Sequence, residues 1–395
     1  MRQVSTTAAK VLDYEYDYAV PAYFAITKHC NIRCSYCYLS EEYKNQKEHR
    51  DRDSIDGLRE FVQKAKKERF ALEVAYLHGA EATTLSPEAM VEAIGLLQEI
   101  TLMRTISVQT NGVALNKSYL DKIGNIQEDV SFGYSVDLPP AAHNKNRQGT
   151  YNKVIENIKI ARGRGYRHRL LVCINKDTMK DLDAVKKEIL YYHKEFPGMT
   201  IAFKMITGDL QITEKQEVIW ANFLLNNGIQ DYDHSIWGPN KICHARGNNC
   251  WWFEFAFDGG VTACNKSYNE DGKFADWKTE PMSYIMQKRM ALYQNHRVPA
   301  TCFGCKYWSI CKGGCPADRY VVNDAVTKEN GVREIGNRVL SLNCKIRKTV
   351  YERMEKNGVN PIVEAYKLPR FTRQLEYKKW VTVGKKLRFL EKKDV

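Results

Sequence analysis

Long apolar runs are missing from this sequence of 395 residues. No stretch approaches the ~18 consecutive apolar residues of a membrane helix, and residues 1–20 lack the apolar core of a signal peptide. Internal repeats and low-complexity segments are also missing, and 44% hydrophobic and 27% charged residues are ordinary for a globular protein. We therefore expect a cytoplasmic protein with no membrane partner, and the length favours more than one domain.

Cysteine is too sparse for a small disulfide scaffold. Twelve of the 395 residues are Cys, far below the ~8–10% typical of such scaffolds, and a reducing cytoplasm disfavours disulfides. The spacing of the cysteines indicates another use. Three lie within residues 30–37, eight lie within residues 243–344, and Cys173 stands alone.

Strand-like and helix-like segments alternate over the first 230 residues. Short β-branched and aromatic runs predict strands at 23–27, 73–78, 105–110, 130–136, 169–174 and 200–206. Apolar periodicity and capping residues predict helices beginning at 54 and spanning 86–103, 116–123, 151–162, 178–193 and 213–226. This alternation predicts an α/β fold with a parallel sheet, whose active site lies at the carboxyl ends of the strands.

Beyond about residue 235 the alternation stops, and Cys, Gly, Trp and Asn dominate. This composition predicts a loop-rich domain held together by cysteine ligands, with a helix from about 337 to 356. We expect an N-terminal extension at 1–20, an α/β domain at 21–235, a cysteine-rich domain at 236–345 and a basic helix or tail at 346–395.

The positive charge is concentrated at the C-terminal end. Residues 345–395 carry 15 Lys and Arg against 6 Asp and Glu, and so hold nine of the thirteen net positive charges. A solvated tail is the plain interpretation, and contact with an acidic substrate, a leader peptide or nucleic acid is the alternative.

Three cysteines follow the first predicted strand directly. Cys30, Cys34 and Cys37 have the spacing C-x3-C-x2-C. Three thiolates on one loop can bind three irons of a [4Fe-4S] cluster and leave the fourth iron open to another ligand. Structural zinc is the alternative, but it normally takes four ligands, and His29 adjoins Cys30 too closely to be the fourth.

This motif resembles that of the radical S-adenosylmethionine (radical SAM) superfamily, CxxxCxφC, with Tyr36 at the aromatic position φ. The resemblance implies a partial (β/α)6 TIM barrel in which the open iron binds S-adenosyl-L-methionine. Members of the superfamily cleave this cofactor reductively to a 5′-deoxyadenosyl radical, which abstracts a hydrogen atom from the substrate. An electron donor such as flavodoxin or ferredoxin is then the expected partner.

Further segments resemble the cofactor-binding segments of the superfamily, in the same order along the chain. Residues 79–81 resemble its GGE segment with Ala for the second Gly, residues 108–112 resemble the segment that ends the third strand, and a Ser and an Arg follow. The resemblance implies cofactor contacts by Tyr36, Gly79, Ala80, Glu81, Asn111, Ser135 and Arg147. Each of these residues could also serve as an ordinary loop or capping residue.

The C-terminal cysteines resemble the SPASM domain of peptide-modifying members, C-x(9–15)-G-x4-C followed by CxxCx5CxxxC and a last Cys. Only the spacing from Cys250 to Gly259 is one residue short. The resemblance implies one auxiliary [4Fe-4S] cluster on Cys243, Cys250, Cys264 and Cys315. It implies a second on Cys302, Cys305, Cys311 and Cys344. We therefore expect three clusters, with the two auxiliary ones suited to electron transfer, and two zinc sites as the alternative.

The sequence departs from sulfatase-maturing members at the position of their catalytic base. Those enzymes have an aspartate base after the cysteine that corresponds to Cys264, and Asn265 stands here instead. An amide cannot act as a carboxylate base, which argues against Cα-formylglycine formation. Only 29 residues precede Cys30, so we expect a leader-peptide-binding domain to be absent or to be supplied by another chain.

We expect an enzyme that crosslinks, oxidises or epimerises a peptide or protein. A small-molecule substrate, such as a sugar or aminocyclitol, is the alternative. A nonenzymatic iron–sulfur or zinc protein that binds nucleic acid is disfavoured by the open-iron motif. Cys173, on the fifth predicted strand, is either a buried apolar thiol or a hydrogen-atom donor to a substrate radical, as an epimerase would need.

Overall fold

The computed structural model describes the backbone and side chains of most of the chain. The described residues are 12–37, 39, 50–206, 208–229, 252–264, 272–292, 300–311, 313–314 and 344–361, with the backbone of four short strands near the C-terminal end. Two compact units are present, residues 1–136, 143–170 and 251–292 in the first, and residues 137–142, 171–250 and 293–395 in the second. Within the described residues, no helix has the length and apolar character needed to span a bilayer.

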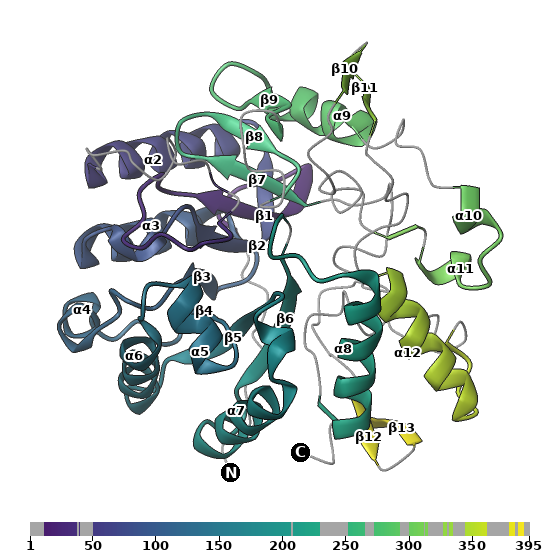
Figure 1. Ribbon diagram of the computed structural model, residues 1–395. Coiled ribbons are helices and arrows are strands. Elements are labelled where there is room, and N and C mark those ends of the chain that lie inside the picture. Colours follow the sequence, from purple (N-terminus) through teal and green to yellow (C-terminus); the bar gives the residue numbers. More distant parts are fainter. Residues whose placement is uncertain are drawn as a thin grey trace. The chain divides into compact units, whose positions relative to one another are not determined.

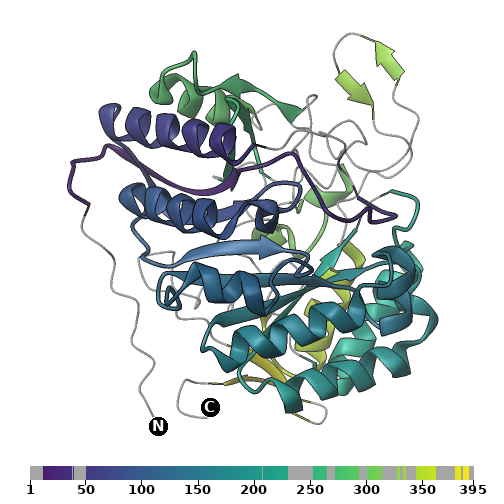
Figure 2. The same cartoon turned by 90° about the vertical axis from the view of Figure 1, so that its left-hand side faces the viewer.

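Four parallel strands form the centre of the first unit. They are β1 (Tyr18–Ala25), β2 (Phe70–His78), β3 (Ile106–Thr110) and β4 (Val130–Val136), each paired with the next. Helices α2 (Asp51–Lys67), α3 (Pro87–Ile100), α4 (Lys117–Ile123) and α6 (Tyr151–Gly163) lie on one side of these strands (Figure 1), and Figure 2 looks onto that side. The predicted α/β fold with a parallel sheet is confirmed.

Strand β1 begins five residues earlier than the sequence pattern predicts. Pro21 cannot donate a backbone hydrogen bond, and within a pattern it argues against a strand. The structure accommodates it with a shift of register between Val20 and Pro21, so that Tyr18 to Val20 still pair with β2. Helix α3 begins as predicted, because Ser86 caps it by accepting from the Ala89 amide and Pro87 follows at the first position.

The second unit continues the alternation. Strand β5 (Arg167–Ile174) begins in the first unit and ends in the second, where β6 (Thr200–Met205) is its neighbour. Helices α7 (Leu182–Glu195) and α8 (Glu214–Asn227) follow β5 and β6. The predicted helix over 178–193 is divided into a 3-10 turn, η2 (Thr178–Lys180), and α7, because Asp181 caps a new helix by accepting from the Ala184 amide.

The remaining elements of the second unit are short apart from one helix. They are α10 (Ala300–Phe303), α11 (Trp308–Cys311), α12 (Cys344–Lys356), and the hairpins β10 (Thr327–Glu329) with β11 (Val332–Glu334) and β12 (Lys379–Val383) with β13 (Lys386–Leu390). The first part of the helix predicted from 337 lies outside the described residues. The C-terminal hairpin is a feature that the basic composition of this segment did not predict.

Part of the cysteine-rich region belongs to the sheet of the first unit. Strand β7 (Phe253–Ala256) pairs parallel with β1, and β8 (Gly260–Thr262) and β9 (Ala275–Asp276) extend the sheet antiparallel. Strands of two to four residues are too short to show a period, which is why composition predicted loops here. Helix α9 (Met282–Leu292) follows them. The predicted boundaries at 20, 235 and 345 stay predictions.

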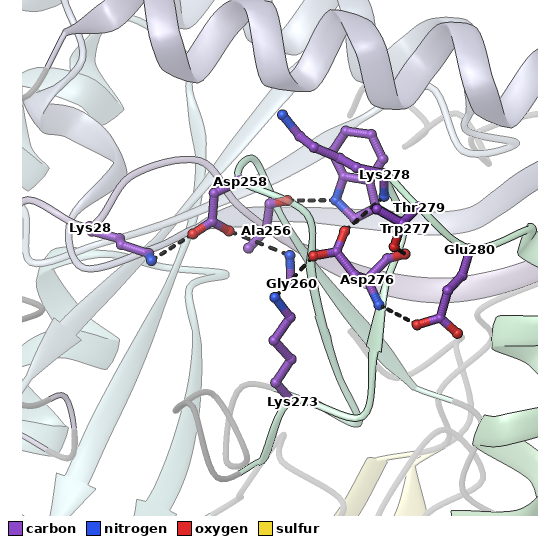
Figure 3. Close-up of polar contacts among 10 residues, drawn as sticks. All are labelled: Lys28, Ala256, Asp258, Gly260, Lys273, Asp276, Trp277, Lys278, Thr279 and Glu280. Carbon is purple, nitrogen blue, oxygen red and sulfur yellow. Dashed lines mark hydrogen bonds and ion pairs between the residues drawn. The ribbon is translucent and has the colours of Figure 1, made fainter.

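Polar contacts hold this added hairpin in place (Figure 3). Lys28, just after β1, forms an ion pair of 2.6 Å with Asp258 in the turn after β7. The indole Nε1 of Trp277 donates to the carbonyl oxygen of Ala256 at 2.6 Å. Gly259 has φ +111°, and a Cβ atom there would lie 2.5 Å from an Asp276 carboxylate oxygen, so the turn requires glycine.

The two faces of the sheet differ in character. Phe24 of β1 and Phe255 of β7 both pack against Phe61 of α2, with ring centroids 5.2 and 4.8 Å apart. Their neighbours along each strand, Tyr23 and Glu254, therefore point to the opposite face. We call that opposite side the inner face. In the first unit its side chains include Tyr23, Tyr76, His78, Gln109, Ser135, Arg169 and Glu254.

Gly57 of α2 allows the helix to approach the hairpin closely. A Cβ atom at this position would lie 2.2 Å from the backbone oxygen of Phe257. Although Gly→Ala normally favours a helix by up to ~1 kcal/mol, we expect Gly57→Ala to destabilise the protein by about 1–3 kcal/mol because backbone must move. The measurement is the thermal unfolding midpoint.

Gly95→Ala is the matched control, because Gly95 is an exposed residue of α3 with no heavy atom within 4 Å of the added Cβ. The control should unfold at the same temperature as the unsubstituted protein or higher. Equal midpoints for both variants would contradict the close contact between α2 and residue 257.

Candidate functional site

The first cysteine group lies on the loop that leaves β1. Cys30, Cys34 and Cys37 are all half-buried, and the Cys37 amide donates to the Cys34 carbonyl at 3.1 Å in a tight turn. Cys37 packs against an apolar cluster of Ala25, Leu39 and Ala256. Burial raises the pKa of Cys30 to about 11. A thiolate at this position therefore needs a bound cation to stabilise it, as iron would.

Residues 146 and 147, in the segment after β4, form hydrogen bonds with the cysteine loop. The Ser35 hydroxyl donates to the Asn146 side-chain oxygen at 2.8 Å, and the Ser35 amide donates to the Asn146 carbonyl. The next residue, Arg147, is buried and donates through Nε to the Tyr36 hydroxyl at 2.9 Å. The structure thus brings together Tyr36 and Arg147, two residues that the sequence indicated independently.

The segment after β2 runs along the residues before Cys30. The Ala80 amide donates to the Thr27 carbonyl at 2.9 Å, and the Glu81 amide donates to the His29 carbonyl at 3.0 Å. Gly79 has φ +145°, and a Cβ atom there would lie 2.4 Å from the Thr27 oxygen, so only glycine fits. Ala80 is tolerated because its methyl group packs against the cluster of Ala25, Leu39 and Ala256.

Glu81 is buried and its carboxylate accepts four hydrogen bonds. Oε1 accepts from the Thr83 amide, the Thr83 hydroxyl and the Thr110 hydroxyl at 3.0, 2.6 and 2.7 Å. Oε2 accepts from the Asn111 amide at 2.6 Å. Burial raises the pKa of Glu81, and these hydrogen bonds oppose the increase. Its carboxylate therefore joins the ends of β2 and β3.

Asn111 continues this connection to the cysteine loop. Its Nδ2 donates to the Asn31 side-chain oxygen at 2.7 Å and lies 4.0 Å from the Cys30 sulfur. Its Oδ1 accepts from the Val113 amide at 3.0 Å. On β4, the half-buried Ser135 hydroxyl accepts from Gln109 Nε2 at 3.1 Å. All seven residues predicted to contact the cofactor lie at the carboxyl ends of β1 to β4 or in the loops that follow, and their contacts stay predictions.

The inner face carries polar residues that the motif search missed. Glu254 of β7 is fully buried, and its Oε1 lies 3.3 Å from His78 Nε2 at the end of β2. Burial raises the pKa of Glu254, whereas His78 acts in the opposite direction. Rings of Tyr23, Tyr76 and Trp252 pack beside this pair, with centroids 4.8 to 5.5 Å apart. The signal in the sequence was a single Glu between two Phe, which is weak by itself.

Cys173 lies in the part of β5 that belongs to the second unit. It is half-buried, whereas Leu170, Val172 and Ile174 are fully buried. Alternation places the thiol on the same face of β5 as Arg169, the inner face, and not among these apolar neighbours. Cys173 is thus half-buried and not fully buried, and both interpretations of it, as an apolar thiol and as a hydrogen-atom donor, stay predictions.

Four of the C-terminal cysteines line one cavity in the second unit. Cys302, Cys305, Cys311 and Cys344 border a space of about 470 Å³, open mouth included. Tyr307, Arg347, Lys348 and Tyr351 also line it. Within the described residues, no group of three His, Cys, Asp or Glu side chains is placed to hold a metal ion. The four cysteines are those that the resemblance to the SPASM domain implies for one auxiliary cluster.

The other auxiliary set is only partly described. Cys264 is buried in the first unit, two residues beyond β8. Cys243, Cys250 and Cys315 lie outside the described residues, as does Asn265. The ligand assignments of both sets stay predictions.

Comparison with known proteins identifies a radical SAM domain in this chain. The model of the Radical SAM superfamily matches residues 24–189, so the chain contains a radical SAM domain and the predicted resemblance is confirmed. The cysteine-type anaerobic sulfatase-maturating enzyme of Clostridium novyi (strain NT) is 21% identical in an alignment of 323 residues that covers 73% of this chain and 85% of the relative. The serine-type enzyme of Bacteroides thetaiotaomicron is 21% identical in an alignment of 341 residues that covers 74% of this chain and 81% of the relative.

Solved structures share the fold. Native anSMEcpe with bound AdoMet has a TM-score of 0.64 and 18% identity, over 89% of this chain and 100% of that chain. Streptococcus suis SuiB bound to S-adenosylmethionine has a TM-score of 0.57 and 12% identity, over 82% of this chain and 78% of that chain.

His143 gives the segment beside the cysteine loop a pH dependence. It is buried in α5 (Pro140–Asn146), its Nε2 lies 3.0 Å from the Thr150 hydroxyl, and its carbonyl accepts from the Arg147 amide. Burial, assisted by the charge of Arg147, lowers the pKa of His143 to about 3. The imidazole is therefore neutral at physiological pH.

This shift predicts a loss of stability in mild acid. Below pH ~6.5 the unfolded chain takes up a proton on His143 that the folded protein refuses until about pH 3, so the folded state loses stability as the pH falls through this window. We expect His143→Gln to remove this dependence. The difference in free energy of unfolding between the unsubstituted protein and the variant should fall by about 2 kcal/mol from pH 7.5 to pH 5. The measurement is urea unfolding at each pH. Parallel stability curves would contradict a buried neutral imidazole.

Proposed function

We propose that this protein uses a [4Fe-4S] cluster on Cys30, Cys34 and Cys37 to cleave S-adenosyl-L-methionine reductively and to modify a peptide or protein substrate. The observation that carries the proposal is the placement of these three thiols on one loop after β1. The Glu81 and Asn111 contacts hold that loop against the ends of β2 and β3.

The residues around the loop suit the cofactor. When bound, the cluster supplies the electron that cleaves the cofactor to the 5′-deoxyadenosyl radical. Arg147 places a buried positive charge beside the cysteine loop, which suits a carboxylate. Gly79 keeps the backbone after β2 free of a side chain, and Ser135 offers a hydroxyl at the end of β4.

Two auxiliary clusters are part of the proposal. Cys302, Cys305, Cys311 and Cys344 would hold one, and their position around a single cavity supports this set. Cys243, Cys250, Cys264 and Cys315 would hold the other. Fully cysteine-ligated clusters are suited to electron transfer, so the two would conduct an electron to or from the substrate. Flavodoxin or ferredoxin would supply the electron that starts the reaction.

A peptide is the favoured substrate. SuiB has been solved with its precursor peptide SuiA, and anSMEcpe with the Kp18Cys peptide. Asn265 stands where sulfatase-maturing enzymes have their aspartate base, so we propose a different oxidation or crosslink from formylglycine formation. A separate protein that binds a leader peptide would be a partner. A small molecule such as a sugar or aminocyclitol is the alternative substrate.

Epimerisation is the second candidate reaction. The half-buried position of Cys173 on the inner face of β5 favours it, because a donor thiol must be reachable from the substrate. The thiol would give a hydrogen atom to the substrate radical from the face opposite to abstraction.

Iron content and cofactor cleavage test the main proposal. We expect the anaerobically reconstituted protein to bind about twelve irons, four for each cluster, and to form 5′-deoxyadenosine when reduced with dithionite. Cys34→Ala should bind about eight irons and form no 5′-deoxyadenosine. Cys302→Ala is the matched control, since it should also bind about eight but still form 5′-deoxyadenosine. The absence of 5′-deoxyadenosine from the unsubstituted protein under strong reductant would refute the proposal.

Substitution of Cys173 separates the two candidate reactions. We expect Cys173→Ser to abolish net epimerisation while cofactor cleavage continues, because a hydroxyl is a far poorer hydrogen-atom donor than a thiol. The measurement is the mass and chirality of a co-expressed precursor peptide. An unchanged product from Cys173→Ser would leave Cys173 without a catalytic role.

A further inference from the structure

Arg347 is a buried positive charge beside the second cysteine group. It lies one turn after Cys344 on α12, with only 1% of its surface exposed. Its Nη1 donates to the Cys311 sulfur at 3.6 Å, and its side chain lines the same cavity as the four thiols. A guanidinium is costly to bury unless an anion compensates for it.

The thiols have the complementary problem. All four thiols are half-buried around the same cavity, and metal ligation requires them as thiolates. Four thiolates around one cavity therefore repel one another in a poorly solvated space. Arg347 and Lys348 are the positive charges among the residues that line the cavity.

The two cations are not equivalent. Arg347 is buried and hydrogen-bonded to a sulfur, whereas Lys348 is only half-buried. Water and salt screen a partly exposed charge much more than a buried one. The carboxylate of Glu355, one helical turn after Tyr351, is engaged elsewhere, by Lys306 Nζ at 2.6 Å and the Tyr307 hydroxyl at 2.9 Å.

We infer that Arg347 raises the reduction potential of the auxiliary cluster proposed on Cys302, Cys305, Cys311 and Cys344. This inference rests on the proposed function, which supplies the cluster. Reduction adds one negative charge to a cluster, so a fixed positive charge next to a ligand sulfur stabilises the reduced form. A hydrogen bond to that sulfur acts in the same direction, because it also stabilises the more negative, reduced cluster. Nearby charge and hydrogen bonds to sulfur are both established determinants of cluster potential.

The potential bears on the direction of electron flow. An electron moves spontaneously towards the site of higher potential. With Arg347 in place, this cluster accepts an electron more readily than the same cluster would without the charge. Arg347 is a positioning residue in this sense, because it acts on the cluster and does not touch the substrate.

Redox titration followed by electron paramagnetic resonance tests the inference on the full-length, anaerobically reconstituted protein. The potential that disappears in Cys302→Ala identifies the cluster. In Arg347→Gln we expect the ratio of reduced to oxidised cluster at a fixed potential to fall at least about tenfold, equivalent to 59 mV for one electron. Arg347→Lys keeps the charge and should stay closer to the unsubstituted protein.

Arg353→Gln is the matched control on the same helix. Arg353 donates to Asn222 and Asn226 of α8 and does not line the cavity, so its loss should leave the potential unchanged. An unchanged potential in Arg347→Gln with full iron content would overturn the inference, and so would an equal decrease in Arg347→Lys. If Arg347→Gln lacks the iron of this site, Arg347→Lys decides the outcome. Normal iron content and potential in Arg347→Lys support the inference, whereas loss of iron from both variants overturns it.

Failure of the proposed function is distinguishable from failure of this inference. If Cys302→Ala and the unsubstituted protein bind the same amount of iron, the proposed auxiliary cluster itself is refuted. A cluster that binds normally and keeps its potential in Arg347→Gln would refute only the role of Arg347.

Discussion

Glu81 brings a carboxylate into the interior of the first unit, where it accepts four hydrogen bonds from the segment after β2 and the carboxyl end of β3. A buried carboxylate is costly without such partners, so the ends of β2 and β3 must meet around it. Asn111 lies in this network and reaches Asn31 in the cysteine loop. The position of Cys30 thus depends on a chain of hydrogen bonds that begins at Glu81, in the segment after β2. A substitution of Glu81 would therefore alter the position of the thiols.

The same physical conflict recurs at both cysteine groups. Burial raises the pKa of Cys30 and of Cys344, although metal ligation requires thiolates. Each group has an arginine close by, Arg147 through Tyr36 at the first and Arg347 at the second. The thiols would therefore suit a positively charged occupant, and the arginines would compensate the excess negative charge of the proposed clusters. Iron binding and folding are coupled wherever a site has this character.

The sequence predicted the features that follow a period or a known motif. It missed the features that depend on contacts between residues distant in the sequence. The alternation of strands and helices predicted β1 to β6, and the resemblance to the SPASM domain grouped four thiols that share a cavity. Strands β7 to β9 were missed because two to four residues show no period. Arg347 and Glu254 were missed because burial, the property that makes them unusual, comes from residues distant in the sequence.

The pairing of β7 with β1 has a consequence for how the chain is made. Strand β1 is synthesised more than 220 residues before residues 253–256, which pair with its second edge. Until then the nascent sheet exposes a row of unsatisfied backbone groups, which is a hazard for aggregation. The Lys28–Asp258 ion pair likewise forms only after Asp258 has been synthesised. Completion of the sheet is thus a late event of high contact order, and the cysteine loop beside β1 reaches its final surroundings only after translation has passed β7.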